Sequence, residues 1–185
     1  MKDAIALLKQ DHKEVKDMLE QLSETSERAG KKRQELASKI ARALQAHMEI
    51  EEQIFYPAFK AAAAKKEDQK LYYEAVEEHH AADVVCQDVL RADVTSLNFG
   101  GKAKVLKELI EHHIEEEEKT MFPHARKVMS KEILQALGIE MADMKESVMN
   151  GGLANPSKAK TNGNKAAKTR ATKGKSSGRS RVAHP

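Results

Sequence analysis

Apolar residues recur every three or four positions over most of the chain, the spacing that places them on one face of an α-helix. The pattern predicts four long amphipathic helices, at roughly residues 2–24, 31–64, 67–93 and 101–128. The first of these faces, for example, carries Ile5, Leu8, Val15, Leu19 and Leu22. Because each helix must bury its apolar face, the sequence predicts an all-α, up-down four-helix bundle.

Glycine, asparagine and proline mark the places where these helices should end or bend. Gly30 lies between the first two helices, and Asn98, Gly100 and Gly101 lie between the third and the fourth. Pro57 and Pro123 fall inside the second and fourth helices, where a proline removes a backbone hydrogen bond. We expect a break at each glycine position and a kink at each proline.

A shorter amphipathic segment, residues 130–149, follows the four long helices. Ser130 can cap its N-terminus, although Gly138 lowers its helix propensity. Its apolar residues are Ile133, Leu134, Leu137, Met141 and Val148. The segment is predicted to be a fifth helix packed outside the bundle.

The sequence changes character near residue 150, which divides the chain into a bundle domain, residues 1–149, and a tail, residues 150–185. The tail is rich in Gly, Ser, Thr, Ala, Asn and Lys without periodicity, so it is expected to be disordered. The chain has a formal net charge of +3, but residues 151–185 contain nine Lys or Arg and no acidic residue. The remaining 23 basic and 29 acidic residues give the bundle domain a net charge of −6.

This basic tail resembles the tails of bacterial nucleoid and linker-histone-like proteins. A segment of this kind binds the phosphate backbone of duplex DNA by counterion release, without reading bases. The alternative is a solvated tail that contacts the acidic bundle of the same or a neighbouring chain. The sequence is consistent with both functions of the tail, non-specific DNA binding and contact with an acidic bundle.

Cysteine content and hydropathy restrict where the protein works. Cys86 is the single cysteine, so no internal disulfide can form, and the N-terminal residues lack the apolar run of a signal peptide. No apolar stretch approaches the ~20 residues needed to cross a bilayer. These features predict a cytoplasmic protein without a membrane span.

Histidines and glutamates occupy positions on the apolar faces of the predicted helices. His12 is on the face of the first helix, and His79 lies toward one side of the third. The second helix carries His47 and Glu51 one turn apart at the middle of its face, and the fourth repeats this with His113 and Glu117.

A single histidine on an apolar face is usually a hydrogen-bonded core residue. Four such placements together with two carboxylates are different, because buried carboxylates are unfavourable without a positive charge and these faces carry no Lys or Arg. A bound cation provides that charge. Imidazole and carboxylate donors without thiolate suit iron, manganese or zinc, and two bridging carboxylates suit a pair of ions.

The segments 47–57 and 113–123 are two copies of the motif H-x3-E-E-x3-(F/Y)-P. Together with Asp11-His12 and Glu78-His79-His80, this duplication resembles the hemerythrin HHE cation-binding family over about residues 1–149. The resemblance implies two non-haem iron ions bridged by an oxo or hydroxo group and by carboxylates, with manganese or zinc less favoured. The implied bridging ligands are Glu51 and Glu117, and the implied terminal ligands are His12, His47, His79 and His113.

The third helix departs from the oxygen-carrying members of the family, which have a second histidine four residues after the first. Asp83 occupies that position here, so one iron has either an aspartate or an open coordination position. His80 is rotated about 100° from His79 and is expected at the surface. Glu52 and Glu118, which follow the bridging glutamates, are expected to face solvent or to cap a partner.

Two function classes follow from this pattern. The favoured one is a di-iron protein that binds or senses O2, iron or a similar small ligand. The alternative is a di-iron enzyme that consumes peroxide or nitric oxide, or oxidises Fe(II). Ferritin-like storage is disfavoured because those bundles use Glu-x-x-His rather than His-x3-Glu.

Overall fold

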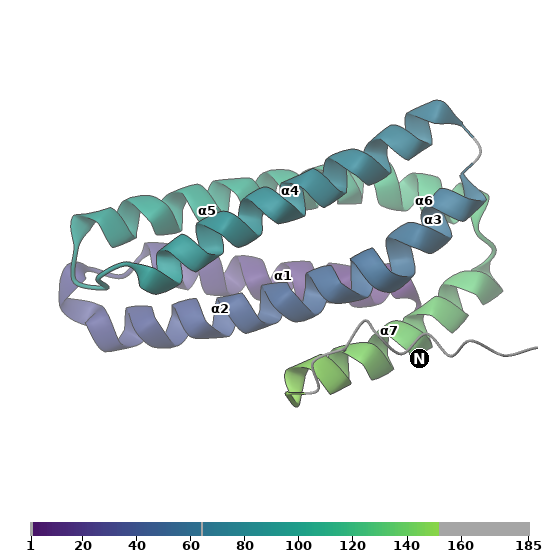
Figure 1. The fold of residues 1–185 in the computed structure, drawn as a ribbon. Helices are drawn as coiled ribbons and strands as arrows, with labels where there is room; N and C mark the ends of the chain where they lie inside the picture. The colour runs from purple at the N-terminus through teal and green to yellow at the C-terminus, as the bar shows by residue number, and fades with distance from the viewer. Residues whose placement is uncertain (1, 64, 152–185) are drawn as a thin grey trace, which may run out of the picture. The chain divides into compact units, whose positions relative to one another are not determined.

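The computed structural model describes residues 2–63 and 65–151, whose regular structure is helical throughout (Figure 1). Along the chain these residues form α1 (Ala4–Ser23), a short 3-10 segment (Glu27–Ala29), α2 (Gly30–Ile50), the π-helical segment η2 (Glu51–Phe55), α3 (Tyr56–Ala62), α4 (Lys66–Arg91), α5 (Leu97–Glu116), the π-helical segment η3 (Glu117–Met121), α6 (Phe122–Val128) and α7 (Lys131–Met149). The predicted all-α class is confirmed. The tail beyond Gly151, with its predicted disorder and DNA binding, lies outside the described residues.

The four long helices form a ring around a common axis (Figure 1). Helix α1 packs against α2 and α5, and α4 packs against the same two helices from the other side. Helix α7 lies outside this ring and contacts α1, α2 and η2. The up-down bundle with a fifth, external helix is therefore confirmed.

Gly138 lets α7 approach the start of the chain. A Cβ atom at this position would lie 2.7 Å from the Lys2 carbonyl oxygen and 2.8 Å from the Ala4 backbone nitrogen. Leu134 and Met141, on the same face of α7, are buried. Gly138 thus lowers the helix propensity of α7 but permits its close packing against the backbone at the start of the chain.

Each internal proline is preceded by a π-helical turn in an otherwise continuous helix. The Tyr56 N–H donates to the Glu51 carbonyl, and the Phe122 N–H donates to the Glu117 carbonyl, five residues back in both cases. The wider turn accommodates the proline without ending the helix. Glu51 and Glu117 are the first residues of these two segments.

The break predicted at residues 98–101 is wrong, because α5 begins at Leu97 and runs through them. The Ser96 hydroxyl accepts a hydrogen bond from the Phe99 N–H at 3.1 Å, and the Phe99 side chain is buried. This cap and this buried ring outweigh the low helix propensity of the two glycines. Gly30, likewise expected between helices, is the first residue of α2.

The core consists of two apolar clusters with a polar layer between them. Along α1, Leu8 belongs to one cluster and Val15 to the other, with His12 between them. Along α4, His79 separates Ala75 of the first cluster from Ala82 of the second. The polar layer therefore lies in the middle of the bundle, with an apolar cluster on either side of it along the helix axes.

In the part of the chain that the structure describes, no helix combines the length and the apolar character needed to cross a membrane.

Candidate metal centre

All six residues predicted to bind metal meet in the polar layer, and all six are buried. They come from every helix of the ring: His12 from α1, His47 from α2, Glu51 from the start of η2, His79 from α4, His113 from α5 and Glu117 from the start of η3. The His-x3-Glu spacing places each glutamate one turn beyond its histidine, and the π-helical segment begins at that glutamate.

The donor atoms fall into two groups that share one glutamate. The first group is His12, His47, Glu51 and Glu117, and the second is Glu51, His79 and His113; within each, the donor atoms lie within 4.8 Å of one another. The shared carboxylate oxygen, Glu51 Oε2, lies 3.1 Å from His47 Nε2 and 3.3 Å from His79 Nε2. Two adjacent cation positions joined by Glu51 fit this arrangement.

Several buried polar atoms in this layer have no hydrogen-bond partner among the described residues. They are His12 Nε2, both ring nitrogens of His47, Glu51 Oε1, Glu117 Oε2 and Asp11 Oδ2. Glu117 Oε2 lies 3.1 Å from His12 Nε2 and 3.5 Å from His113 Nε2 without hydrogen-bond geometry to either ring. Buried polar atoms are normally satisfied, so the four of these atoms that belong to the donor groups, His12 Nε2, His47 Nε2, Glu51 Oε1 and Glu117 Oε2, fit the binding of metal there.

The carboxylates give this layer a strong preference for positive charge. Burial alone would lower the pKa of His47, but the carboxylates of Glu51, Asp11 and Glu117 together outweigh burial and raise that pKa to about 10. Burial likewise opposes charge on His79, yet the carboxylates around it, Glu51 and Glu52 foremost, raise its pKa to about 9. Burial would raise the pKa of Glu51, but His47 and His79 together hold it well below its usual range. Bound metal would supply the same positive charge and release protons from the rings.

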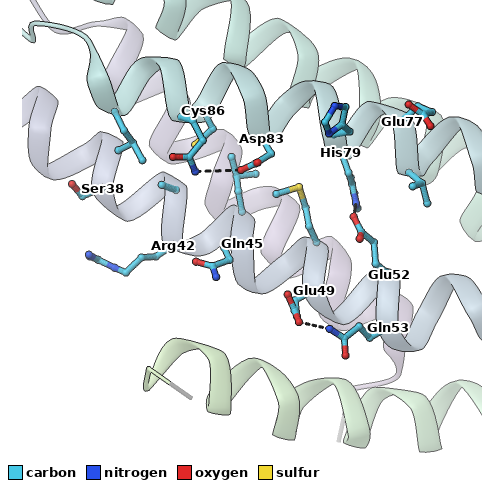
Figure 2. A pocket seen from close by; sticks show the side chains of 17 residues that line it. Ser38, Arg42, Gln45, Glu49, Glu52, Gln53, Glu77, His79, Asp83 and Cys86 are labelled. Carbon is cyan, nitrogen blue, oxygen red and sulfur yellow. Dashed lines mark hydrogen bonds and ion pairs between the residues drawn. The ribbon is translucent and has the colours of Figure 1, made fainter. Parts of the chain in front are cut away.

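Three of the histidines have a second carboxylate on the ring nitrogen that faces away from the cluster. The Nδ1 atoms of His12, His79 and His113 lie 2.9, 2.9 and 2.8 Å from the carboxylates of Glu118, Glu52 and Glu78, respectively. Such a partner fixes the tautomer and the orientation of a ligating imidazole and increases its basicity. Figure 2 shows one of these pairs, Glu52 of η2 beside His79 of α4.

The fourth histidine has a looser partner. His47 Nδ1 lies 3.6 Å from Asp11 Oδ2, and the other oxygen of Asp11 accepts a hydrogen bond from Lys145 of α7 at 2.5 Å. Burial would raise the pKa of Asp11, but its contacts with His47 and Lys145 lower it. Helix α7 thus contacts Asp11, the carboxylate nearest to Nδ1 of His47, through Lys145.

The sequence predicts that Glu52 and Glu118 face solvent or cap a partner, and the structure shows both features. Both are partly exposed, but each places one oxygen on a histidine ring of another helix. The second glutamate of each Glu-Glu pair points to a different side of its helix from the first and so reaches the neighbouring helix. This repeated pair was the signal in the sequence that could have identified them.

Tyr56 lies directly against the donor atoms. Its hydroxyl donates to Glu117 Oε1 at 2.8 Å and lies 3.2 Å from His79 Nε2 and 3.4 Å from Glu51 Oε2. Burial and the two carboxylates raise the pKa of this hydroxyl well above its usual value, so it remains a neutral donor. It holds both glutamates in position.

His80 and Asp83 lie outside the cluster. Both are exposed on α4, and Asp83 accepts a hydrogen bond from Gln87 at 3.3 Å. Helix α4 therefore contributes His79 alone to the two buried donor groups.

A small cavity lies beside the donor cluster, with room for about one water-sized molecule. Its walls are the four histidines and the apolar side chains of Val15, Leu44, Met48, Ile110 and Ile114. The space next to the ring nitrogens is thus bounded mostly by hydrocarbon.

Comparisons with known proteins agree with this geometry. The family model described as the hemerythrin HHE cation binding domain matches residues 3–125. The fold is similar to the crystal structure of a hemerythrin HHE cation binding domain-containing protein from Mycobacterium kansasii, with a TM-score of 0.71 and 27% sequence identity, covering 82% of this chain and 90% of that one. The chain is also 24% identical over 142 residues to a protein from Nostoc sp. named DNA nickase. The match covers 77% of this chain but 39% of that relative.

Proposed function

The chain belongs to the hemerythrin HHE cation-binding family, and on that premise we propose that it holds two non-haem iron ions and uses them to bind or sense O2 or a similar small ligand. The observation that carries the proposal is the pair of buried donor groups joined by Glu51. Nitrogen and carboxylate donors without thiolate suit iron, and a shared carboxylate suits two adjacent ions. Glu51 and Glu117 would bridge, and the four histidines would be terminal ligands.

If both glutamates bridge, each position would have two histidines and two carboxylates, with His12 and His47 at one position and His79 and His113 at the other. Glu117 Oε2 supports this arrangement, because it lies 3.1 Å from His12 Nε2 and 3.5 Å from His113 Nε2. Iron bound by four protein donors keeps coordination positions open for a small ligand. The exposed position of Asp83 favours such an open position over a seventh protein ligand.

Iron at these positions would supply a redox-active Lewis acid able to bind a small ligand reversibly. The surrounding residues hold it and restrict what reaches it. Tyr56 fixes the two bridging glutamates, and the outer carboxylates fix three of the four rings. The apolar cavity beside the rings has the size and polarity for a small uncharged molecule.

The alternative is an enzyme built on the same centre, which consumes peroxide or nitric oxide or oxidises Fe(II). One experiment tests the di-iron proposal and separates the two classes. The optical spectrum of the purified full chain under air should show oxo-bridged ferric charge-transfer bands. After anaerobic reduction, mixing with O2, peroxide or nitric oxide distinguishes reversible binding from turnover. A colourless protein that stays colourless after iron reconstitution would contradict the proposal.

A second candidate function is non-specific binding of duplex DNA. Two observations favour it: the nine Lys or Arg without an acidic residue in 151–185, and the relative named DNA nickase. A mobility-shift titration at low and moderate salt should show salt-sensitive binding by the full chain and its loss in a chain truncated after Asn150. Equal weak binding by both proteins would exclude the tail as a DNA-binding arm.

A further inference from the structure

A groove of about 970 Å³ runs along the outside of the bundle between α2 and α4 (Figure 2). Its lining includes Leu44, Met48 and His79, and the same three residues line the small cavity beside the donor cluster. The groove and the cavity are therefore separated by the thickness of these side chains. We propose that this groove is the access route by which a small uncharged ligand reaches the metal centre, and that Met48 opens and closes it. This inference rests on the proposed di-iron function.

Among the three dividing side chains, Met48 is the one free to move. Leu44 is a buried member of the core, and His79 is held by hydrogen-bonding contacts with Glu52 and Tyr56. Met48 is only half-buried and packs at the margin of the apolar cluster. An unbranched thioether side chain changes rotamer readily, and such changes at partly exposed positions take picoseconds to nanoseconds.

The remaining apolar walls of the cavity are closed. Val15 on α1 and Ile110 and Ile114 on α5 are all buried within the core cluster. Entry past them would require separation of packed helices, whereas entry past Met48 requires rotation about side-chain bonds. The α2–α4 side is therefore the lowest barrier between solvent and the cavity.

The chemistry of the route selects uncharged ligands. The groove carries the carboxylates of Glu49, Glu52, Glu77 and Asp83 against the single guanidinium of Arg42, so its ionisable rim is net negative and disfavours anions. The hydrocarbon wall at Met48 disfavours hydrated cations, which would lose solvation there. A small uncharged molecule meets neither barrier.

The experiment uses the full chain, loaded with iron, reduced anaerobically and mixed with nitric oxide as the probe in a stopped-flow spectrometer. Met48→Ala should raise the association and dissociation rate constants together by about tenfold, and Met48→Trp should lower both by a similar factor. Because Met48 also lines the cavity, the diagnostic result is not the dissociation constant alone but a change of the two rate constants in the same direction, so that their ratio changes less than either of them. Met48→Leu, which conserves volume, should stay near the wild-type rates.

Met18→Ala is the matched control, because Met18 on α1 is another half-buried methionine beside the same apolar cluster and lines neither the groove nor the cavity. It should leave both rate constants unchanged. Wild-type rates in iron-loaded Met48→Ala and Met48→Trp, or a changed dissociation constant with unchanged association, would overturn the access route. Absence of iron from the wild-type chain would instead overturn the proposed function, so the two failures are distinguishable.

Discussion

Removing the charge of Glu52 tests how strongly the carboxylates outside the donor cluster control metal binding. Glu52 places Oε1 2.9 Å from Nδ1 of His79, and its side chain is 44% exposed. Because a half-exposed pair is screened by water, its direct contribution to folding stability is only ~0–1 kcal/mol. The larger effect should fall on the metal, since losing the orienting partner of a ligating imidazole typically lowers metal affinity about 10- to 100-fold.

The expected order of iron affinity is wild type, then Glu52→Gln, then Glu52→Ala. The glutamine amide oxygen can still accept a hydrogen bond from Nδ1–H but lacks the negative charge, whereas alanine removes both. A loss of 10- to 100-fold equals ~1.4–2.8 kcal/mol. Competition with a calibrated chelator, followed by optical absorption, measures this shift in iron affinity. Glu118→Ala should lower the iron affinity similarly, because Glu118 Oε1 also lies 2.9 Å from a ring nitrogen, His12 Nδ1.

Glu49→Gln is the matched control, because Glu49 lies two residues before the π-helical segment and accepts a hydrogen bond from Gln53 rather than from a histidine. It should leave iron affinity unchanged and confirm that one surface charge alone has no effect. Unchanged iron affinity in both Glu52→Ala and Glu118→Ala would refute the reasoning, since these carboxylates would then play no part in holding the rings.

Three further predictions follow from the geometry. Glu51→Ala and Glu117→Ala should each lose both ions in elemental analysis, since each carboxylate lies near histidines of both donor groups; retention of one ion per chain would contradict bridging. His79→Ala should abolish the iron absorption while His80→Ala leaves it intact, and the opposite result would show that the wrong face of α4 was assigned. Gly138→Ala should lower the free energy of unfolding by about 1–3 kcal/mol in thermal denaturation, because the new Cβ would meet backbone atoms; stabilisation, as helix propensity alone predicts, would contradict the close approach.

The sequence predicts the bundle and the six central residues well because both depend on helical periodicity. A residue one turn from an apolar neighbour shares its face whatever the rest of the fold does, so the inward position of His47 and Glu51 follows from spacing alone. The duplicated motif then relates the second and fourth helices. These properties are local to one helix.

The features that the sequence does not predict depend on how helices meet. Glu52 lies off the apolar face of its own helix, and its contact with His79 exists only because α2 and α4 are neighbours at that height. Gly138 looks unfavourable until the backbone at Lys2 is placed beside it. The run through residues 98–101 is likewise helical because Phe99 is buried in the core, which helix propensity does not include.

Elemental analysis of the purified full chain, expressed with iron available, tests the central claim most directly. Six converging nitrogen and oxygen donors in two groups that share Glu51 predict two iron atoms per chain. Six donor residues are too many for one tetrahedral zinc ion, which takes four ligands. One zinc atom per chain and no iron would contradict the account.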